Sequence, residues 1–126
     1  MSLKFPNSEH LKSRKTIGEL FQSGMSIKVF PLRFQFSIRK MEIDEEYMNI
    51  GFVVAKKHHK LAVNRNRIKR QIRESFRLNR KILHKKLIEK NLHLDMMIIF
   101  INPNISSYQH IDKTMIKGIQ KLCEKL

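Results

Sequence analysis

The chain contains few of the features that mark secreted or membrane proteins. Its only cysteine, Cys123, excludes an internal disulfide and indicates a reducing compartment. The longest apolar run, residues 96–101, is much shorter than the ~18–20 residues that a membrane-spanning helix needs. The N-terminus also lacks the apolar stretch of a signal peptide. We therefore expect a cytoplasmic protein that contacts no membrane.

Acidic residues are also scarce. The chain holds 11 Asp or Glu against 26 Lys or Arg, which gives a formal net charge of +15. The imbalance is concentrated in residues 56–86, where thirteen Lys or Arg face a single acid, Glu74. A surface with so little negative charge indicates a polyanionic partner.

The basic region has the periodicity of one long helix. Residues 62–77 read AVNRNRIKRQIRESFR. At about 100° per residue, one arc of the helix, expected to face the core, holds Ile68, Ile72, Phe76, Asn79 and Leu83. The opposite arc is cationic and holds Lys69, Arg70, Arg73, Arg77, Arg80, Lys81 and His84. The pattern predicts an amphipathic helix with a basic outer face.

The start of this helix predicts a phosphate site. Asn64 is the expected N-cap, and Arg65 and Arg67 then occupy the first turn, where the helix dipole disfavours each cation by about 0.3–1 kcal/mol. A bound phosphate would reverse that penalty, because backbone N–H groups and guanidinium forks both donate to it.

The run AKKHHKLAVNRNRIKRQIRESFR resembles the signature of the bacterial ribonuclease P protein subunit. In that family a Lys-Lys pair ends a strand, and a short loop, an Arg-Asn-Arg element and a basic helix follow. The matching positions are Lys56, Lys57, Ala62, Arg65, Asn66, Arg67, Lys69, Arg70, Arg73 and Glu74. The resemblance extends more weakly over nearly the whole chain.

The order of elements predicts one α+β domain. We expect a basic, flexible segment at 1–12 and a single domain at 13–126. A short helix has a capping box of Thr16 and Glu19, an apolar stripe of Ile17, Leu20 and Phe21, and a stop at Gly24. Strands are expected at 32–38, 47–55 and 96–101, the last covered on both sides. A turn at 102–107 precedes a closing helix whose inward stripe is Ile111, Met115, Ile119 and Leu122.

The resemblance adds a topology. It implies the order α-β-β-β-α-β-α, arranged as in the second domain of a small-subunit ribosomal protein. Its β-α-β crossover would be left-handed, although about 98% of such connections are right-handed.

The resemblance also implies a function. The catalyst would be a large RNA that uses Mg²⁺ to remove the 5′ leader of precursor tRNA. The protein, an essential cofactor that needs no protein partner, would bind both RNAs. The residues expected to bind the catalytic RNA are Arg65, Asn66, Arg67, Lys69, Arg70, Arg73 and Arg77. The residues expected in a leader-binding cleft between the first helix and the sheet are Ile17, Phe21, Phe34, Phe36, Lys56 and Lys57.

The chain departs from the family at two places in this region. Ile17 replaces an aromatic residue, and the loop at 58–61 lacks a glycine. Either Phe34 or Phe36 would supply the aromatic of the first strand, and the alternative is that both face the core.

An active site on the protein itself is not expected. The six histidines, which show no metal-ligand spacing and are expected at the surface, are His10, His58, His59, His84, His93 and His110. A metal-dependent nuclease would need a group of acidic residues, and the chain has one such cluster, Glu42, Asp44, Glu45 and Glu46. Clustered acids beside a hairpin are more typical of a solvated turn. Cys123 reads as a semi-buried residue of the last helix.

Two further interpretations remain open. A ribosomal or other structural RNA-binding protein of the same fold would bind ribosomal RNA. A sequence-specific DNA-binding protein would place the basic helix in a major groove, but no helix precedes it in the manner of a helix-turn-helix motif.

Overall fold

The computed structural model describes residues 14–126, so the predicted flexible segment at 1–12 lies outside it. The elements in chain order are α1 (Arg14–Ser23), β1 (Met25–Val29), β2 (Leu32–Lys40), β3 (Met48–Val54), α2 (Ala62–Asn79), α3 (Lys81–Lys90), β4 (Leu92–Phe100) and α4 (Tyr108–Glu124). Helix α1 already includes Thr16, so the capping box predicted there does not mark the helix start, whereas the stop before Gly24 is confirmed.

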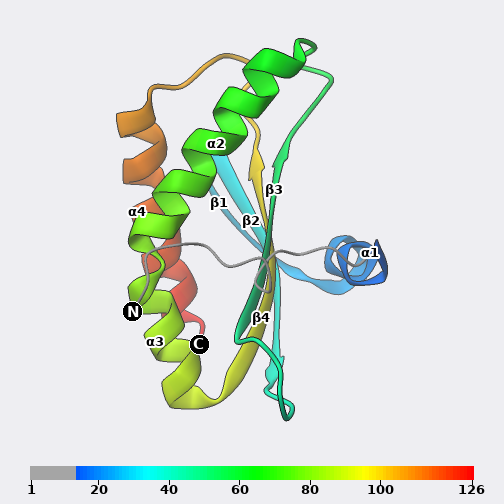
Figure 1. Cartoon of the computed structure of the whole chain (residues 1–126), viewed down its shortest axis with the longest axis vertical. Coiled ribbons are helices and arrows are strands. Elements are labelled where there is room, and N and C mark those ends of the chain that lie inside the picture. Colours follow the sequence, from blue (N-terminus) through cyan, green and yellow to red (C-terminus); the bar gives the residue numbers. More distant parts are fainter. Residues whose placement is uncertain (1–13) are drawn as a thin grey trace.

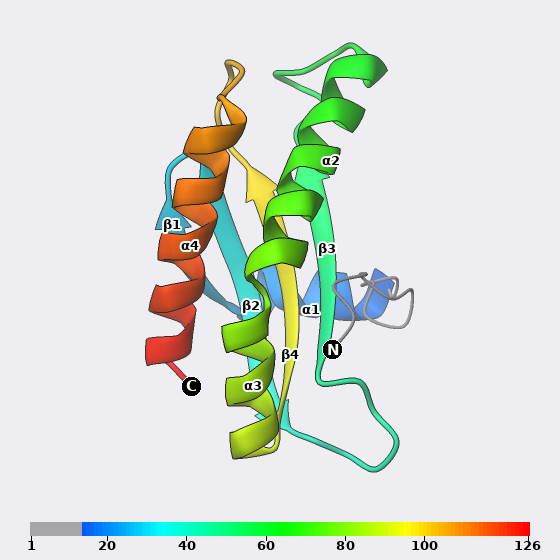
Figure 2. The same ribbon diagram turned by 60° about the vertical axis from the view of Figure 1, so that its left-hand side comes forward.

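The four strands form one sheet in the order β1-β2-β4-β3. Strand β2 is antiparallel to both of its neighbours, β1 and β4, whereas β3 pairs with β4 in parallel. Helices α2, α3 and α4 cover one face, and α1 lies on the other (Figure 1). In Figure 2 the three helices lie in front of the sheet, and β4 lies to the left of the upward-running β3. The crossover from β3 to β4 is therefore left-handed, as expected.

The core lies between the sheet and the three helices. Alternate residues of β2 point into it, and Leu32, Phe34 and Phe36 are all 0% exposed. The predicted inward stripes are confirmed, since the buried residues of the helices include Ile68, Ile72, Phe76, Leu83, Ile111, Met115, Ile119 and Leu122. At Gly118 an added Cβ would lie 2.2 Å from Cε2 of Phe34, so α4 approaches the sheet too closely for any larger residue.

The predicted long helix is broken at Arg80. Helix α2 ends at Asn79, and Arg80, which is only 5% exposed, connects it to α3. His84 is half-buried, and its ring meets the edge of the Tyr47 ring at 5.8 Å. The prediction that Arg80 and His84 belong to the exposed cationic face is therefore wrong, because the helical projection assumed one straight helix.

Polar links supplement the apolar packing of α2 on α4. The side-chain amide of Asn79 donates to the Ser75 carbonyl at 2.8 Å and to Oδ1 of Asp112 on α4 at 2.9 Å. The Ser75 hydroxyl donates to the same carboxylate oxygen at 2.7 Å. Asn79 thus faces inward as predicted, but it is half-buried and joins two helices through hydrogen bonds.

Strand β4 begins four residues before the predicted 96–101, at Leu92. Helix α3 ends in a left-handed residue, Asn91 (φ 53°), whose backbone N–H is directed at the Ile88 and Leu87 carbonyls, and the chain enters β4 at once. The early part of β4 alternates His93 and Asp95 with Leu92 and Leu94, so its apolar side faces the core and its polar side faces α1.

Candidate nucleic-acid interface

The loop between β3 and α2 is closed by its own backbone. Lys56 and Lys57 are exposed in a turn in which the His58 and His59 N–H groups donate to the Ala55 carbonyl at 3.3 and 3.2 Å. His59 is 6% exposed, packs its ring 5.6 Å from that of Phe100, and donates through Nε2 to the Asn102 carbonyl at 2.8 Å. The prediction of a surface position is therefore wrong for His59, which anchors this loop without a glycine.

Arg65 clamps the same loop onto the start of α2. Its Nη1 donates to the His59 and Lys60 carbonyls, each at 2.8 Å. The helix begins at Ala62 after Leu61, and no side chain caps it. Asn64 lies inside the first turn, so the prediction that it is the N-cap is wrong. The exposed helix start holds no acidic residue in its first turn, which leaves it suited to an anion.

The predicted RNA-binding arginines of α2 divide into two groups. Arg73 lies over the Phe52 ring at 5.7 Å, and Arg77 donates to Glu74 from Nε at 3.1 Å and from Nη2 at 2.5 Å. Within residues 14–126, Arg67 and Arg70 are exposed and form no hydrogen bond or ion pair. These two guanidinium groups are therefore the ones free to bind phosphate. The other predicted residues of this surface are the exposed Asn66 and the half-buried Lys69.

The predicted leader-binding residues are only partly brought together. Helix α1 packs against β2 and β4 on the face of the sheet opposite α2. On α1, Phe21 is 52% exposed and Ile17 is half-buried. Phe34 and Phe36 point to the other face, where both are fully buried, so neither contributes to a cleft under α1. Their alternation with polar residues reflects a strand with one buried face, and the core alternative is correct.

The side of the sheet beneath α1 is polar. Arg33 on β2 donates from Nε to the Ser26 hydroxyl at 3.1 Å and from Nη2 to Oε1 of Gln35 at 3.1 Å. On β3 and β4, Asn49, His93 and Asp95 form a second cluster, in which the Asn49 amide donates to Oδ1 of Asp95 at 3.4 Å. This polar lining was not predicted, although the alternation at positions 93 and 95 is visible in the sequence.

His93 is the centre of that cluster and is 1% exposed, so the prediction of a surface position is wrong for it as well. Its Nδ1 lies 2.6 Å from the Glu46 carbonyl, and its Nε2 lies 2.9 Å from Oδ1 of Asp95. Both of these oxygens are acceptors, and the Asn49 amide nitrogen also lies 3.3 Å from Nε2, so the ring donates to both oxygens only in its protonated form. Burial lowers the pKa of His93, but the bonds to Asp95 and Glu46 outweigh it, and the pKa is raised above 6.5.

We expect folding stability to fall as the pH rises through the raised pKa of His93. A raised folded-state pKa means that the contribution of the imidazolium is fully present below 6.5 and lost above the folded-state value. Urea unfolding followed at a series of pH values across this window measures the decline. His93→Gln should flatten it, whereas replacement of the exposed His110 by Gln should leave it intact. An unchanged decline in His93→Gln would show that another group is responsible.

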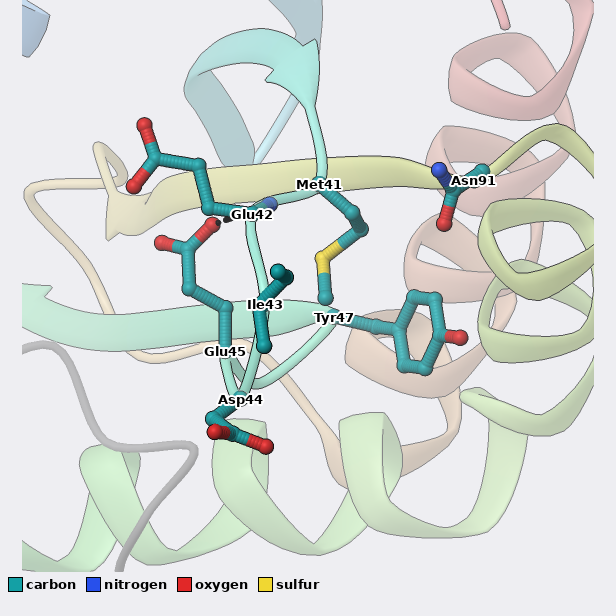
Figure 3. Close-up of a pocket in the computed structure, with 7 residues that line it drawn as sticks. All are labelled: Met41, Glu42, Ile43, Asp44, Glu45, Tyr47 and Asn91. Carbon is teal, nitrogen blue, oxygen red and sulfur yellow. Dashed lines mark hydrogen bonds between the residues drawn. The ribbon is translucent and has the colours of Figure 1, made fainter.

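The acidic connection between β2 and β3 forms a solvated turn, as predicted. A bidentate ion pair joins Arg39 to Glu45. The pKa of Glu45 falls to about 2, chiefly because Arg39 donates hydrogen bonds to its carboxylate. The Glu42 N–H also donates to Glu45, at 3.0 Å, and Ile43 is 93% exposed (Figure 3). The turn borders an open hollow of about 310 Å³ lined by Met41, Glu42, Ile43, Asp44, Glu45, Tyr47 and Asn91.

No group of three or more His, Cys, Asp or Glu side chains in residues 14–126 is arranged to hold a metal ion. In the same part, no helix combines the length and the apolar character needed to cross a membrane.

Comparison with known proteins supports the reading of the signature. The model of the family described as Ribonuclease P matches residues 5–125. The chain belongs to the ribonuclease P protein family. One family member, the ribonuclease P protein component of Porphyromonas gingivalis, is 30% identical over 115 residues, which is 91% of this chain and 83% of that protein.

Solved ribonuclease P proteins have the same fold. The Staphylococcus aureus protein aligns with a TM-score of 0.64 and 21% identity, over 92% of this chain and 95% of that one. The Thermotoga maritima protein aligns with a TM-score of 0.68 and 21% identity, over 90% and 96%. The mixed α+β fold of this chain is therefore shared with solved ribonuclease P proteins.

Proposed function

We propose that this chain is the protein subunit of a ribonucleoprotein endoribonuclease in the cytoplasm. In this role it assists a catalytic RNA in the removal of the 5′ leader from precursor tRNA. The observation that supports the proposal most strongly is the exposed start of α2, where an uncapped helix terminus adjoins the guanidinium groups of Arg67 and Arg70, which have no partner among residues 14–126. Fixed forks of this kind match the phosphates of a folded RNA.

The surface is pre-organised by contacts within the protein. His59 ties the loop before α2 to the segment after β4, and Arg65 ties that loop to the helix. The Lys56 and Lys57 turn is therefore held beside the helix start, and RNA binding would order few additional groups. A surface that is rigid before binding loses less conformational entropy when the RNA docks.

The second part of the proposal places the leader on the α1 side of the sheet. Phe21 offers an exposed ring, and β2 beneath α1 adds the exposed guanidinium of Arg33. Single-stranded nucleotides bind to surfaces that combine an aromatic ring with cationic and polar groups. With Phe34 and Phe36 excluded, Phe21 is the aromatic residue on which this proposal depends.

Magnesium would act with the RNA and not with the protein. Residues 14–126 hold no metal-binding group of His, Cys, Asp or Glu, so we propose that Mg²⁺ is bound mainly by the RNA subunit and the substrate. When bound there, it supplies activation of the attacking water and stabilisation of the leaving oxygen. The side chains of this chain bind and orient the two RNAs.

Phe21→Ala is expected to separate the two RNA surfaces. Affinity for the catalytic RNA should stay largely intact. The assembled particle should lose its preference for leader-bearing precursor over mature tRNA, by about 1–3 kcal/mol for one stacked base. The measurement is a pair of affinities of the particle, for precursor and for mature tRNA. Leu78→Ala on α2, also half exposed at 46%, is the matched control. Equal preferences in Phe21→Ala and in the wild type would refute the leader site.

A further inference from the structure

A second aromatic and cationic surface lies on the helical side of the molecule. It is a hollow of about 210 Å³ between the turn that joins β1 to β2 and the first half of α4. Its lining residues are Val29, Phe30, His110, Lys113, Thr114 and Lys117. In Figure 2, β1 lies beyond α4 on the side away from α2, so this hollow is separate from the signature surface and from the α1 face.

The Phe30 ring is exposed although the turn that carries it is firmly held. The next residues, Pro31 and Leu32, are buried, and the Ile101 N–H donates to the Pro31 carbonyl at 2.9 Å. The Thr114 hydroxyl of α4 donates to the Phe30 carbonyl at 3.5 Å. Phe30 as a whole residue is 52% exposed. Its backbone is thus held by these two hydrogen bonds, while its side chain stays accessible to a ligand.

The charge around the hollow is entirely positive or neutral. Its lining holds Lys113, Lys117 and His110 at helical spacing, and all three are exposed. The nearest acid on α4, Asp112, is turned away and accepts hydrogen bonds from Ser75 and Asn79 of α2. Within residues 14–126 no carboxylate lines the hollow, so Lys113 and Lys117 provide phosphate-binding positions near the ring.

We infer that this hollow binds one unpaired nucleotide of the catalytic RNA, with the base stacked on Phe30 and the flanking phosphates bound by Lys113 and Lys117. Proteins bind single-stranded nucleotides with an exposed aromatic ring, on which the base stacks, and with nearby cations that bind the phosphates. The choice of RNA rests on the proposed function. Helices α2 and α4 pack side by side on one face of the sheet, so an RNA docked on α2 can continue over α4, whereas the leader would lie on the opposite face.

The test compares Phe30→Ala with Phe30→Tyr and with Ile43→Ala, a control at an exposed apolar residue in the β2–β3 turn. Phe30→Ala should weaken binding of the full-length protein to the catalytic RNA by about 5- to 150-fold, which corresponds to the ~1–3 kcal/mol of one stacked base. Phe30→Tyr should retain the affinity, since it keeps a ring, and Ile43→Ala should leave it unchanged. Equal affinities for Phe30→Ala and Ile43→Ala would overturn the inference.

The lysines are tested in the same way. Lys113→Gln with Lys117→Gln should reduce affinity and the salt dependence of binding more than Lys121→Gln with Lys125→Gln, which removes the same charge from the end of α4. Equal effects of the two pairs would contradict a defined site. If Phe30→Ala weakens only precursor binding by the assembled particle, the nucleotide belongs to the substrate and the assignment to the catalytic RNA is wrong.

A separate readout distinguishes this inference from the proposed function. Binding of a short fluorescent oligouridylate to the protein alone requires no catalytic RNA. If the wild type fails to bind the catalytic RNA, the proposed function fails. A loss of oligouridylate binding in Phe30→Ala, with rescue in Phe30→Tyr, would still support a nucleotide site here. Because the leader site could also bind this probe, the comparison is made in a Phe21→Ala background, where full retention of oligouridylate binding after Phe30→Ala would refute the nucleotide site.

Discussion

Replacing Phe76 with alanine should lower the free energy of unfolding by about 3–5 kcal/mol, the usual cost of removing a large buried aromatic side chain. Phe76 is 0% exposed in α2 and meets the Phe52 ring of β3 edge-on, with ring centroids 6.0 Å apart. Its removal would open a cavity between the helix and the sheet, and repacking could fill only part of it. Urea unfolding monitored by circular dichroism measures the change.

Arg70→Ala is the matched control, because Arg70 lies on the same helix but is exposed and has no partner within residues 14–126. Its stability should stay nearly unchanged, or rise slightly as like charges on α2 are relieved. Similar losses in the two variants would mean that the buried and exposed faces of α2 are wrongly assigned.

The second large effect concerns binding. Arg67→Ala and Arg70→Ala should each weaken assembly with the catalytic RNA by about 1.5–3 kcal/mol, the range for a lost hydrogen bond to a charged group. Within residues 14–126 neither side chain has a hydrogen-bond or ion-pair partner, so no ion pair in this part of the chain offsets the loss. The slope of log affinity against log salt should also become shallower, by about 0.7–0.9 for each phosphate contact removed.

Arg39→Ala controls for the loss of one positive charge. Arg39 is an exposed arginine near the C-terminal end of β2, and it is already paired with Glu45. The Arg39→Ala variant should therefore lose much less affinity for the catalytic RNA, and its salt slope should stay nearly unchanged. If Arg39→Ala matched the variants of α2, net charge would explain binding and the defined surface at the start of α2 would not.

The fold was predictable where the information is local. The stripe of Ile68, Ile72 and Phe76 gave the buried face of α2 from periodicity alone, and the alternation in β2 gave its strand. Periodicity alone could not predict the break at Arg80, where the helical phase changes between α2 and α3. Nor could it say which face of β2 lies under which helix, because that depends on contacts with α4 far along the chain.

The candidate site followed the same rule. The basic signature is contiguous, so its loop and helix could be located from the sequence. The internal partners of its side chains could not be located in this way, and the contacts of Arg73 with Phe52 and of Arg77 with Glu74 leave only some of the guanidinium groups without a partner in residues 14–126. His93 looked like an isolated histidine because Asp95 and the Glu46 carbonyl surround it only after the sheet forms.

The lysines of α4 show what local reasoning overlooks. Lys113 and Lys117 recur at helical spacing in the sequence, but they gain significance only beside Phe30, which lies in the turn between β1 and β2. The apolar stripe of the closing helix predicts its buried face, but no local pattern connects its outer face with Phe30. Long-range packing creates this hollow, and only the folded chain reveals it.

The decisive experiment for the role as a ribonuclease P subunit is cleavage of precursor tRNA by reconstituted particles at low Mg²⁺. We expect the catalytic RNA alone to be slow under these conditions and the addition of this protein to restore cleavage at the leader junction. The protein alone should cleave nothing. The Arg67→Ala, Arg70→Ala double variant should restore cleavage poorly. If the wild-type protein gives no stimulation and instead co-sediments with ribosomal subunits, a structural RNA-binding role is correct and the proposed function is wrong.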